Sequence, residues 1–295
     1  MDRRHFLGLS ALGGGVVFAS GLAGCAGLAT APGATRDFYF VQMSDVHWGY
    51  QGEANPDAAI TLRKTVQAVN ALAVPPAFIV FTGDLTHTTD DPAERRRRMR
   101  EFKVIVADLQ VRTHYYLPGE HDASLDRGAA YREHFGDPNY TFVHEGVHFI
   151  ALDNVSDPGA RVGEDQLRWL EATLAPLAAD TPIVVLTHRP LFDLAPRWDW
   201  ATRDGAQVMA ILQRWRNVTV FYGHIHQEHH RMTGHIPHHS AKSLIFPLPA
   251  PGAQEKRTPL PWDAAEPYRG LGFREVHTAA GGSAFGLQEF PVQRS

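Results

Sequence analysis

Acidic residues and histidines recur in short motifs, either beside a glycine or two positions apart. Asp45 and His47 are separated by one residue, so in extended backbone their side chains project to the same side. The pentapeptide 118–122 combines a glycine turn with Glu120, His121 and Asp122. Further motifs contribute these candidate residues: Asp84, His188, His224 and His226. Carboxylate oxygens and imidazole nitrogens are metal ligands, so the motifs predict a metal centre.

Each motif taken alone also has a purely structural explanation. An Asp after a strand can cap a turn, and residues 120–122 could form a buried ion pair or a solvated turn. Five predicted strands, however, are each followed within a few residues by Asp, Glu or His. The carboxyl ends of strands are where α/β proteins assemble their sites. Five independent coincidences are improbable, so we interpret the motifs as one shared site.

The elements that position these motifs are apolar runs of strand length. They cover residues 38–43, 77–81, 114–117, 182–186 and 218–222. Continuous apolar runs suit strands covered on both faces. A hairpin is expected over 140–152, with its turn at Glu145-Gly146.

Amphipathic stretches between these runs predict helices. The first should open with Asn55 as N-cap and Pro56 as its first helical residue. Further helices are expected over residues 93–108, 163–174 and 204–215. Two edge strands, at 272–276 and 284–287, should finish a sheet.

The candidate ligands contain oxygen and imidazole nitrogen and no thiolate, which excludes iron–sulfur clusters and cysteine-type structural zinc. They are Asp45, His47, Asp84, Glu120, His188, His224 and His226. Seven ligands suit two ions about 3.5–4 Å apart that share a carboxylate. Mixed nitrogen and oxygen ligands favour Mn, Fe or Zn over Mg or Ca.

Such a two-metal centre has a defined chemical use. It clamps a phosphoryl or carboxyl oxygen and lowers the pKa of a bridging water, so that hydroxide is available near neutral pH. Ester hydrolysis also needs an acid for the leaving oxygen. His121 is placed for that task, with Asp122 to hold or polarise its ring. A purely structural metal site would not need this additional imidazole.

The ordered set of motifs resembles the calcineurin-like metallophosphoesterase family. The motifs are Asp45-x-His47, Gly83-Asp84, Gly119-x-His121-Asp122, His188 and Gly223-His224-x-His226, within residues 37–230. The spacing of the second and third motifs is similar to the branch that contains cyclic-nucleotide phosphodiesterases. The resemblance implies an α/β (α+β) fold, a four-layer αββα sandwich of two mixed β-sheets flanked by helices, with the dimetal site at strand C-termini.

The resemblance also implies how the ligands are shared. One metal would take Asp45, His47, Asp84 and His226. The other would take Asp84, residue 120, His188 and His224. Asp84 would bridge the two ions, and His121 would be the proton donor.

Residue 120 departs from the family pattern, which normally has Asn there. Glu120 adds a negative charge, loses an amide donor and is one methylene longer. We expect it to bind metal and to disfavour a highly charged phosphomonoester, which favours a phosphodiester substrate. The alternative is a metal-binding envelope lipoprotein with weak or no hydrolase activity. The intact His121-Asp122 pair favours the enzyme.

Two residues beside the ligand motifs are candidate substrate contacts. His87 follows Asp84 closely, and Arg189 adjoins His188; a structural role is the alternative for each. Residues 231–295 are interpreted as a variable C-terminal extension. We expect the histidine-rich segment 229–239 to form a polar loop over the mouth of the site rather than a third metal site, because its ligand spacing is irregular.

The composition is that of a globular protein without a nucleic-acid partner. The chain has 295 residues and a net charge of −4, with no obviously basic face. The arginine run 95–98 is flanked by Glu94 and Glu101, so a solvated helix face is expected. The predicted partner is instead a small phosphoester substrate.

The N-terminus predicts export. Arg3-Arg4 followed by Phe6-Leu7 and a glycine-broken apolar run resembles a twin-arginine signal over 1–24. The stretch 22–25 resembles a bacterial lipobox, in which Cys25 is acylated. An uncleaved membrane anchor is the alternative, although the segment barely reaches the ~20 residues that a spanning helix needs. Residues 25–36 would be a tether and 37–295 a single domain, held in the periplasm or outer cell envelope through a lipid anchor.

Overall fold

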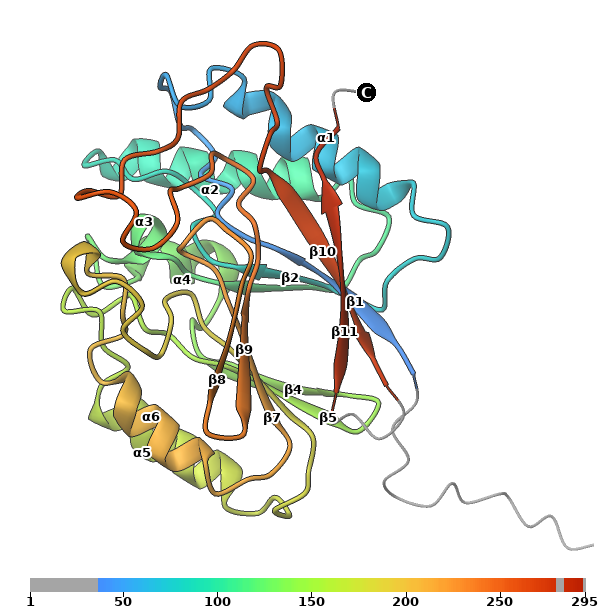
Figure 1. Cartoon of the computed structure of the whole chain (residues 1–295), viewed down its shortest axis with the longest axis vertical. Coiled ribbons are helices and arrows are strands. Elements are labelled where there is room, and N and C mark those ends of the chain that lie inside the picture. The colour runs from blue at the N-terminus through green and yellow to red at the C-terminus, as the bar shows by residue number, and fades with distance from the viewer. Residues whose placement is uncertain (1–36, 280–283, 294–295) are drawn as a thin grey trace, which may run out of the picture. The chain divides into compact units, whose positions relative to one another are not determined.

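The computed structural model describes residues 37–279 and 284–293 (Figure 1). The predicted signal segment, the tether and Cys25 lie outside these residues. Within the described part, two mixed β-sheets are flanked by helices, which confirms the predicted fold class. No helix in this part is both long enough and apolar enough to cross a membrane.

The first sheet has the strand order β11-β10-β1-β2-β3. Its members are β1 (Tyr39–Met43), β2 (Ile79–Thr82), β3 (His114–Leu117), β10 (Gly272–Thr278) and β11 (Phe285–Pro291). β1, β2 and β3 are parallel neighbours, whereas β10 is antiparallel to both β1 and β11. The prediction that 272–276 forms an edge strand is therefore wrong, because β10 pairs on both sides; of the two predicted edge strands, β11 alone lies at an edge.

The second sheet has the order β4-β5-β6-β7-β9-β8. Its members are β4 (Tyr140–His144), β5 (Val147–Ala151), β6 (Ile183–Leu186), β7 (Val218–Tyr222), β8 (His229–Thr233) and β9 (Ile236–Ser240). β5, β6, β7 and β9 are parallel. The predicted hairpin is confirmed, with positive φ at both turn residues, Glu145 and Gly146, as a tight hairpin turn requires.

The histidine-rich segment forms the β8–β9 hairpin, so the prediction of a polar loop over the mouth of the site is wrong. β9 pairs in parallel with β7 and places His238 in the interior. Buried and part-exposed residues alternate along β9. This period of two is typical of a strand, and the prediction missed it because the segment was interpreted by its polar composition.

Helices cover the outer faces of both sheets. They are α1 (Ala58–Asn70), α2 (Pro92–Val106), α3 (Glu120–Ala123), α4 (Ala129–Phe135), α5 (Glu164–Leu174) and α6 (Gly205–Leu212). Leu62 of α1 and Phe102 of α2 pack in one core cluster with the first sheet. Leu170 of α5 and Val208 of α6 pack in another with the second.

A third core cluster joins the two sheets. Phe40 of β1 packs edge-on against Phe149 of β5 and Phe221 of β7, with ring centroids 5.7 and 5.8 Å apart. Fully buried apolar contacts of this kind fix the separation and relative position of the sheets. The strands of both sheets can therefore present their ends to one site.

Two predicted helices differ from the structure at one boundary each, α1 at its start and α6 at its end. Asn55 does not cap α1; its side chain accepts the Asp57 N–H at 3.0 Å and donates to the Ile245 carbonyl at 2.6 Å. Asp204 accepts from the backbone N–H groups of residues 162 and 163, and α6 ends at Leu212 instead of residue 215.

The arginine run on α2 forms ion pairs, as a solvated helix face would. Arg96 pairs with Glu133 and Arg98 with Glu94. Arg95 also forms an ion pair, with its guanidinium 2.7 Å from Asp126, but it is buried and does not belong to the solvated face.

Candidate metal centre

The candidate ligands gather where β1, β2, β6 and β7 end. Backbone hydrogen bonds join the first two of these ends: the Asp45 N–H donates to the Gly83 carbonyl at 3.1 Å, and the His47 N–H to the Asp84 carbonyl at 2.8 Å. The His224 N–H donates to both oxygens of Asp45 at 3.1 Å, which ties the end of β7 to the end of β1. Loops from the two sheets thus form one unit.

The backbone at the ligands is strained. Nine described residues other than glycine have positive φ, and five of them are candidate ligands: Asp45, His47, Asp84, His224 and His226. Such conformations cost on the order of 1–3 kcal/mol each and collect at functional sites, where surrounding structure holds them. A role in capping turns alone would not need five such residues at one place.

Two motif glycines permit close approach of the loops. A Cβ at Gly119 would lie 2.0 Å from Asp84 Oδ1, and one at Gly223 would lie 2.0 Å from Ser44 Oγ. Any side chain at either position would displace atoms beside the ligands. The glycines in these motifs are therefore part of the site's geometry.

The first ligand group consists of Asp45, His47 and His226, whose donor atoms converge. His226 Nε2 lies 3.4 Å from Asp45 Oδ1 and 3.3 Å from His47 Nε2. His47 Nε2 lies 3.4 Å from Asp84 Oδ2. Four ligands about 2.1 Å from one ion in a tetrahedron are separated by ~3.4 Å, so these positions fit a bound metal ion.

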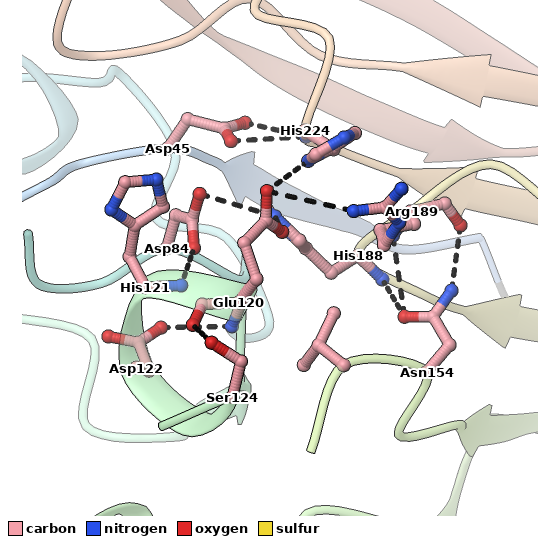
Figure 2. Close-up of polar contacts among 12 residues, drawn as sticks. Asp45, Asp84, Glu120, His121, Asp122, Ser124, Asn154, His188, Arg189 and His224 are labelled. Atoms are coloured by element: carbon pink, nitrogen blue, oxygen red, sulfur yellow. Dashed lines mark hydrogen bonds and ion pairs between the residues drawn. The ribbon is translucent and has the colours of Figure 1, made fainter. Parts of the chain in front are cut away.

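The second ligand group consists of Asp84, Glu120, His188 and His224. His188 Nε2 lies 3.4 Å from Asp84 Oδ2 and 3.0 Å from Glu120 Oε2. His224 Nδ1 lies 2.9 Å from Glu120 Oε1. Asp84 Oδ2 is thus equally far from a histidine of each group, which is the position of a bridging carboxylate. Figure 2 shows Glu120 extending from α3 toward His188 and His224.

Unpaired buried atoms test whether the second group suits an ion. Glu120 Oε2, His188 Nε2 and His224 Nε2 are buried and have no partner with hydrogen-bond geometry. Glu120 Oε2 and His188 Nε2 lie 3.0 Å apart without hydrogen-bond geometry, and a buried polar atom left without a hydrogen bond costs about 1–3 kcal/mol. A metal ion would satisfy such atoms, so the residues present fit the implied centre.

The electrostatics of the site favour added positive charge. Burial raises the pKa of Asp45 to about 8. Burial also lowers the pKa of His224 to about 4 and that of His226 to about 3, which keeps these rings neutral, the form that binds metal. Burial works against a charged His188, yet the carboxylates of Asp84 and Glu120 raise its pKa well above the usual value. Because the carboxylates favour a proton on His188, they would also favour a metal cation in its place.

Backbone carbonyls orient two of the ligand rings through Nδ1, the nitrogen on the side of the ring away from the proposed metal. His188 Nδ1 lies 2.7 Å from the Thr82 carbonyl, and His226 Nδ1 lies 2.8 Å from the Phe246 carbonyl. Each carbonyl accepts the Nδ1 proton and leaves Nε2 as the metal-binding nitrogen. Sequence reasoning missed both contacts, since a carbonyl group carries no residue-type signal.

Asp122 does not hold the His121 ring as predicted. Its Oδ2 accepts from the N–H groups of Leu85 and Gly119 at 2.9 Å, and its Oδ1 from Thr86 N–H and Oγ at 2.8 Å. Asp122 therefore locks α3 onto the loop after β2. Figure 2 shows its carboxylate and the His121 ring pointing in different directions.

His121 itself lies beside the bridging carboxylate. Its N–H donates to Asp84 Oδ1 at 2.9 Å, and its ring packs edge-on against His47 with centroids 4.5 Å apart. The ring Nδ1 accepts from the Thr88 N–H at 3.2 Å, which leaves Nε2 to carry the ring proton.

The two predicted substrate contacts occupy different positions. His87 Nδ1 lies 3.2 Å from His47 Nδ1, and its ring stacks on His121. Arg189 is buried; carbonyls of Asp199 and Ala201 accept from its guanidinium, which lies 4.0 Å from Glu120 Oε1. His87 thus supports a candidate ligand from behind, and Arg189 offsets the charge of Glu120.

A cavity of about 220 Å³ opens above the ligands. Besides five candidate ligands and His121, it is lined by residues far along the chain: Phe246, Leu248, Arg257 and Pro259. The only sequence signal for these residues was the proline-rich stretch after β9. The cavity is smaller than the about 300–1,000 Å³ that encloses a drug-sized ligand, which favours a small substrate or one group of a larger one.

Comparison with known proteins agrees with this geometry. The family model for calcineurin-like phosphoesterase matches residues 38–228, so the chain belongs to that family. A Rhodococcus erythropolis protein named "Probable cyclic nucleotide phosphodiesterase" is 29% identical over 222 residues, covering 70% of this chain and 71% of the relative. The zebrafish serine/threonine-protein phosphatase CPPED1 is 28% identical over 222 residues, covering 64% and 70%.

The fold also matches a solved structure. A dimetal phosphatase from Danio rerio superimposes with a TM-score of 0.56 at 16% identity, covering 86% of this chain and 99% of that one. At this identity the likeness supports the fold alone.

Proposed function

We propose that the protein is a dimetal phosphoesterase that prefers phosphodiesters and uses His121 as general acid. The observation that carries this proposal is the convergence of two ligand groups on Asp84 Oδ2, 3.4 Å from His47 Nε2 and from His188 Nε2. Single-metal and structural sites do not need a carboxylate placed between two histidine sets.

The residues divide the work of hydrolysis between them. Two ions bound by these groups would supply Lewis acidity toward the phosphoryl oxygens and a water of lowered pKa. To act as the acid, His121 must take up a second proton at Nδ1, which gives up the contact with the Thr88 N–H; the imidazolium then donates its Nε2 proton to the leaving oxygen and returns to the neutral ring. Asp122 fixes the turn that carries His121, so that the ring is oriented before substrate arrives.

Glu120 is the basis for the diester preference. It brings a second carboxylate to the ligand group that already contains Asp84. A monoester dianion meets more repulsion there than a diester monoanion. The nearby relative named as a cyclic nucleotide phosphodiesterase supports the same substrate class, whereas the relative named as a protein phosphatase supports monoesters. Monoester hydrolysis is therefore the second candidate activity.

Export to the cell envelope is proposed on the sequence motifs of residues 1–25 alone. The alternative to the phosphoesterase is a metal-binding lipoprotein of the cell envelope with weak or no hydrolase activity. Replacement of Arg3-Arg4 by Lys-Lys should strand the protein in the cytoplasm. Continued export of that variant would contradict the twin-arginine route.

A substrate panel tests the proposed activity. Purified protein loaded with Mn²⁺ is assayed with cyclic nucleotides, nucleotides, glycerophosphodiesters and p-nitrophenyl mono- and diesters. We expect faster hydrolysis of diesters, lost with chelator and restored by Mn²⁺. Absence of turnover with Mn, Fe and Zn across the panel would support the non-hydrolase alternative.

A further inference from the structure

The segment between β9 and β10, residues 241–271, contributes a cation to the candidate site. Arg257 lines the cavity together with candidate ligands from both groups. It comes from a part of the chain that follows the family match, which ends at residue 228. Arg257 therefore lies outside the residues that carry the family match.

The Arg257 guanidinium is exposed, and among residues 37–279 and 284–293 it has no hydrogen-bond or ion-pair partner. Arg189 differs in both respects, since it is buried and carbonyl groups accept from it. Arg257 thus has no acidic partner among the residues that the structure describes.

Hydrogen bonds hold the segment in place on both sides of Arg257. The buried Trp198 donates its Nε1–H to the Glu255 carbonyl at 3.1 Å, and the Leu260 N–H donates to the Pro247 carbonyl at 3.0 Å. The neighbouring Phe246 carbonyl contacts the candidate ligand His226 at 2.8 Å. The position of Arg257 at the mouth of the cavity is therefore set by the fold.

Glu120 is the acidic residue of the cavity best placed to attract a guanidinium, but it already has partners. Its oxygens lie 2.9 Å from His224, 3.0 Å from His188 and 4.0 Å from Arg189. An exposed guanidinium that has no acidic partner and lines this cavity is available to pair with an anion from outside the chain. Its planar set of N–H donors matches two phosphate oxygens at once.

We propose that Arg257 is a substrate-binding residue that contacts a phosphoryl oxygen of the incoming ester and offsets the repulsion from Glu120. This inference rests on the proposed phosphoesterase function. Because the contact exists in the ground state and in the transition state alike, its loss should raise KM more than it lowers kcat.

The test compares Arg257→Gln with Lys256→Gln in the full chain loaded with Mn²⁺. Lys256 is an exposed neighbour of the same charge that does not line the cavity, so it controls for the general loss of a surface cation. Two measurements are made: KM and kcat for bis(p-nitrophenyl) phosphate, and the Kd for inorganic phosphate by calorimetry. Arg257→Lys separates charge from the planar donor geometry.

We expect Arg257→Gln to raise KM and the phosphate Kd by about tenfold, the effect of losing one hydrogen bond to a charged group, with kcat changed by less than about threefold. Arg257→Lys should fall between this variant and wild type, and Lys256→Gln should match wild type. Equal KM and Kd values for Arg257→Gln and Lys256→Gln would overturn the inference.

The phosphate measurement separates failure of this inference from failure of the proposed function. If wild type hydrolyses no ester yet binds phosphate in a manner that depends on Arg257, the binding role holds and the activity is wrong. If wild type hydrolyses the diester and Arg257→Gln behaves as wild type, the activity holds and the role of Arg257 is wrong. Failure of wild type to bind phosphate or turn over the diester would overturn both.

Discussion

The two ligand groups are built differently although they share Asp84. All three residues of the first group, Asp45, His47 and His226, have positive φ and are buried. In the second group, Glu120 starts a helix and its side chain remains 21% exposed. Every residue of the first group has left-handed backbone, as do Asp84 and His224 of the second, whereas Glu120 lies in ordinary helical backbone that any residue type can adopt. That difference explains how a Glu can stand where the family pattern has Asn.

The comparison has a consequence for charge. The second group has two carboxylates, while the first has one of its own. Arg189 lies 4.0 Å from Glu120, and Arg257 lines the cavity to which both groups contribute. We interpret the first group as the constant part of the centre and the second as the part in which this chain sets its substrate preference.

Replacing the shared carboxylate should have the largest effect, because it damages both groups at once. Asp84→Asn is expected to reduce kcat by on the order of 10³-fold, the upper end of losses from removing one electrostatic stabiliser. Bound metal, counted by elemental analysis, should fall below two ions per chain. Full activity with two ions bound would remove Asp84 from its bridging role.

Replacing His121 should separate acid catalysis from metal binding. His121→Asn is expected to lower kcat by about 10²-fold or more on esters with alkoxide leaving groups, with metal content unchanged. The loss should be much smaller on p-nitrophenyl esters, because p-nitrophenolate leaves without a proton. An equal loss on both kinds of ester would argue against His121 as the acid.

Removing His87 should affect the first group more than the second. Its Nδ1 lies 3.2 Å from His47 Nδ1 and helps to fix the ligand ring. His87→Ala is expected to weaken one Mn²⁺ site by about tenfold, the lower end for loss of a residue that supports a ligand. Turnover at saturating Mn²⁺ should change little. A raised KM without weaker metal binding would instead restore the predicted substrate contact.

Glu120→Asn should change the choice between substrates rather than the metal content or the overall rate. Removing the extra carboxylate is expected to raise monoesterase relative to diesterase activity by about tenfold. A factor of ten corresponds to about 1.4 kcal/mol, the electrostatic free energy that shifts a pKa by one unit. The ratio of kcat/KM for p-nitrophenyl phosphate and its diester measures this. An unchanged ratio would show that Glu120 does not set substrate preference.

The ligand motifs could be predicted from local pattern, and the fold class from the resemblance of those motifs to a known family. Apolar runs that end in Asp or His place residues such as Asp45 and Asp84 at strand ends without knowledge of the tertiary structure. The partner of Asp122 could not be predicted in this way. Its carboxylate accepts from backbone N–H groups on another loop, which depends on how β2 and β3 align.

The errors in the C-terminal region have one physical cause. The histidine-rich segment 229–239 was interpreted as a polar loop, although β9 pairs with β7 and His238 is buried against Phe192. Arg257 gave no signal because its function depends on a segment that returns to the site after more than one hundred residues from Glu120. Long-range placement of this kind is fixed by tertiary hydrogen bonds rather than by local pattern.

The central claim is that two ions, shared through Asp84, support phosphodiester hydrolysis. Apoprotein is brought to equilibrium with increasing Mn²⁺ by dialysis, and bound ions and bis(p-nitrophenyl) phosphate turnover are measured on the same samples. The account predicts that full turnover coincides with two bound ions per chain and that chelated protein is inactive. Full turnover with one bound ion, or turnover by the chelated protein, would contradict it.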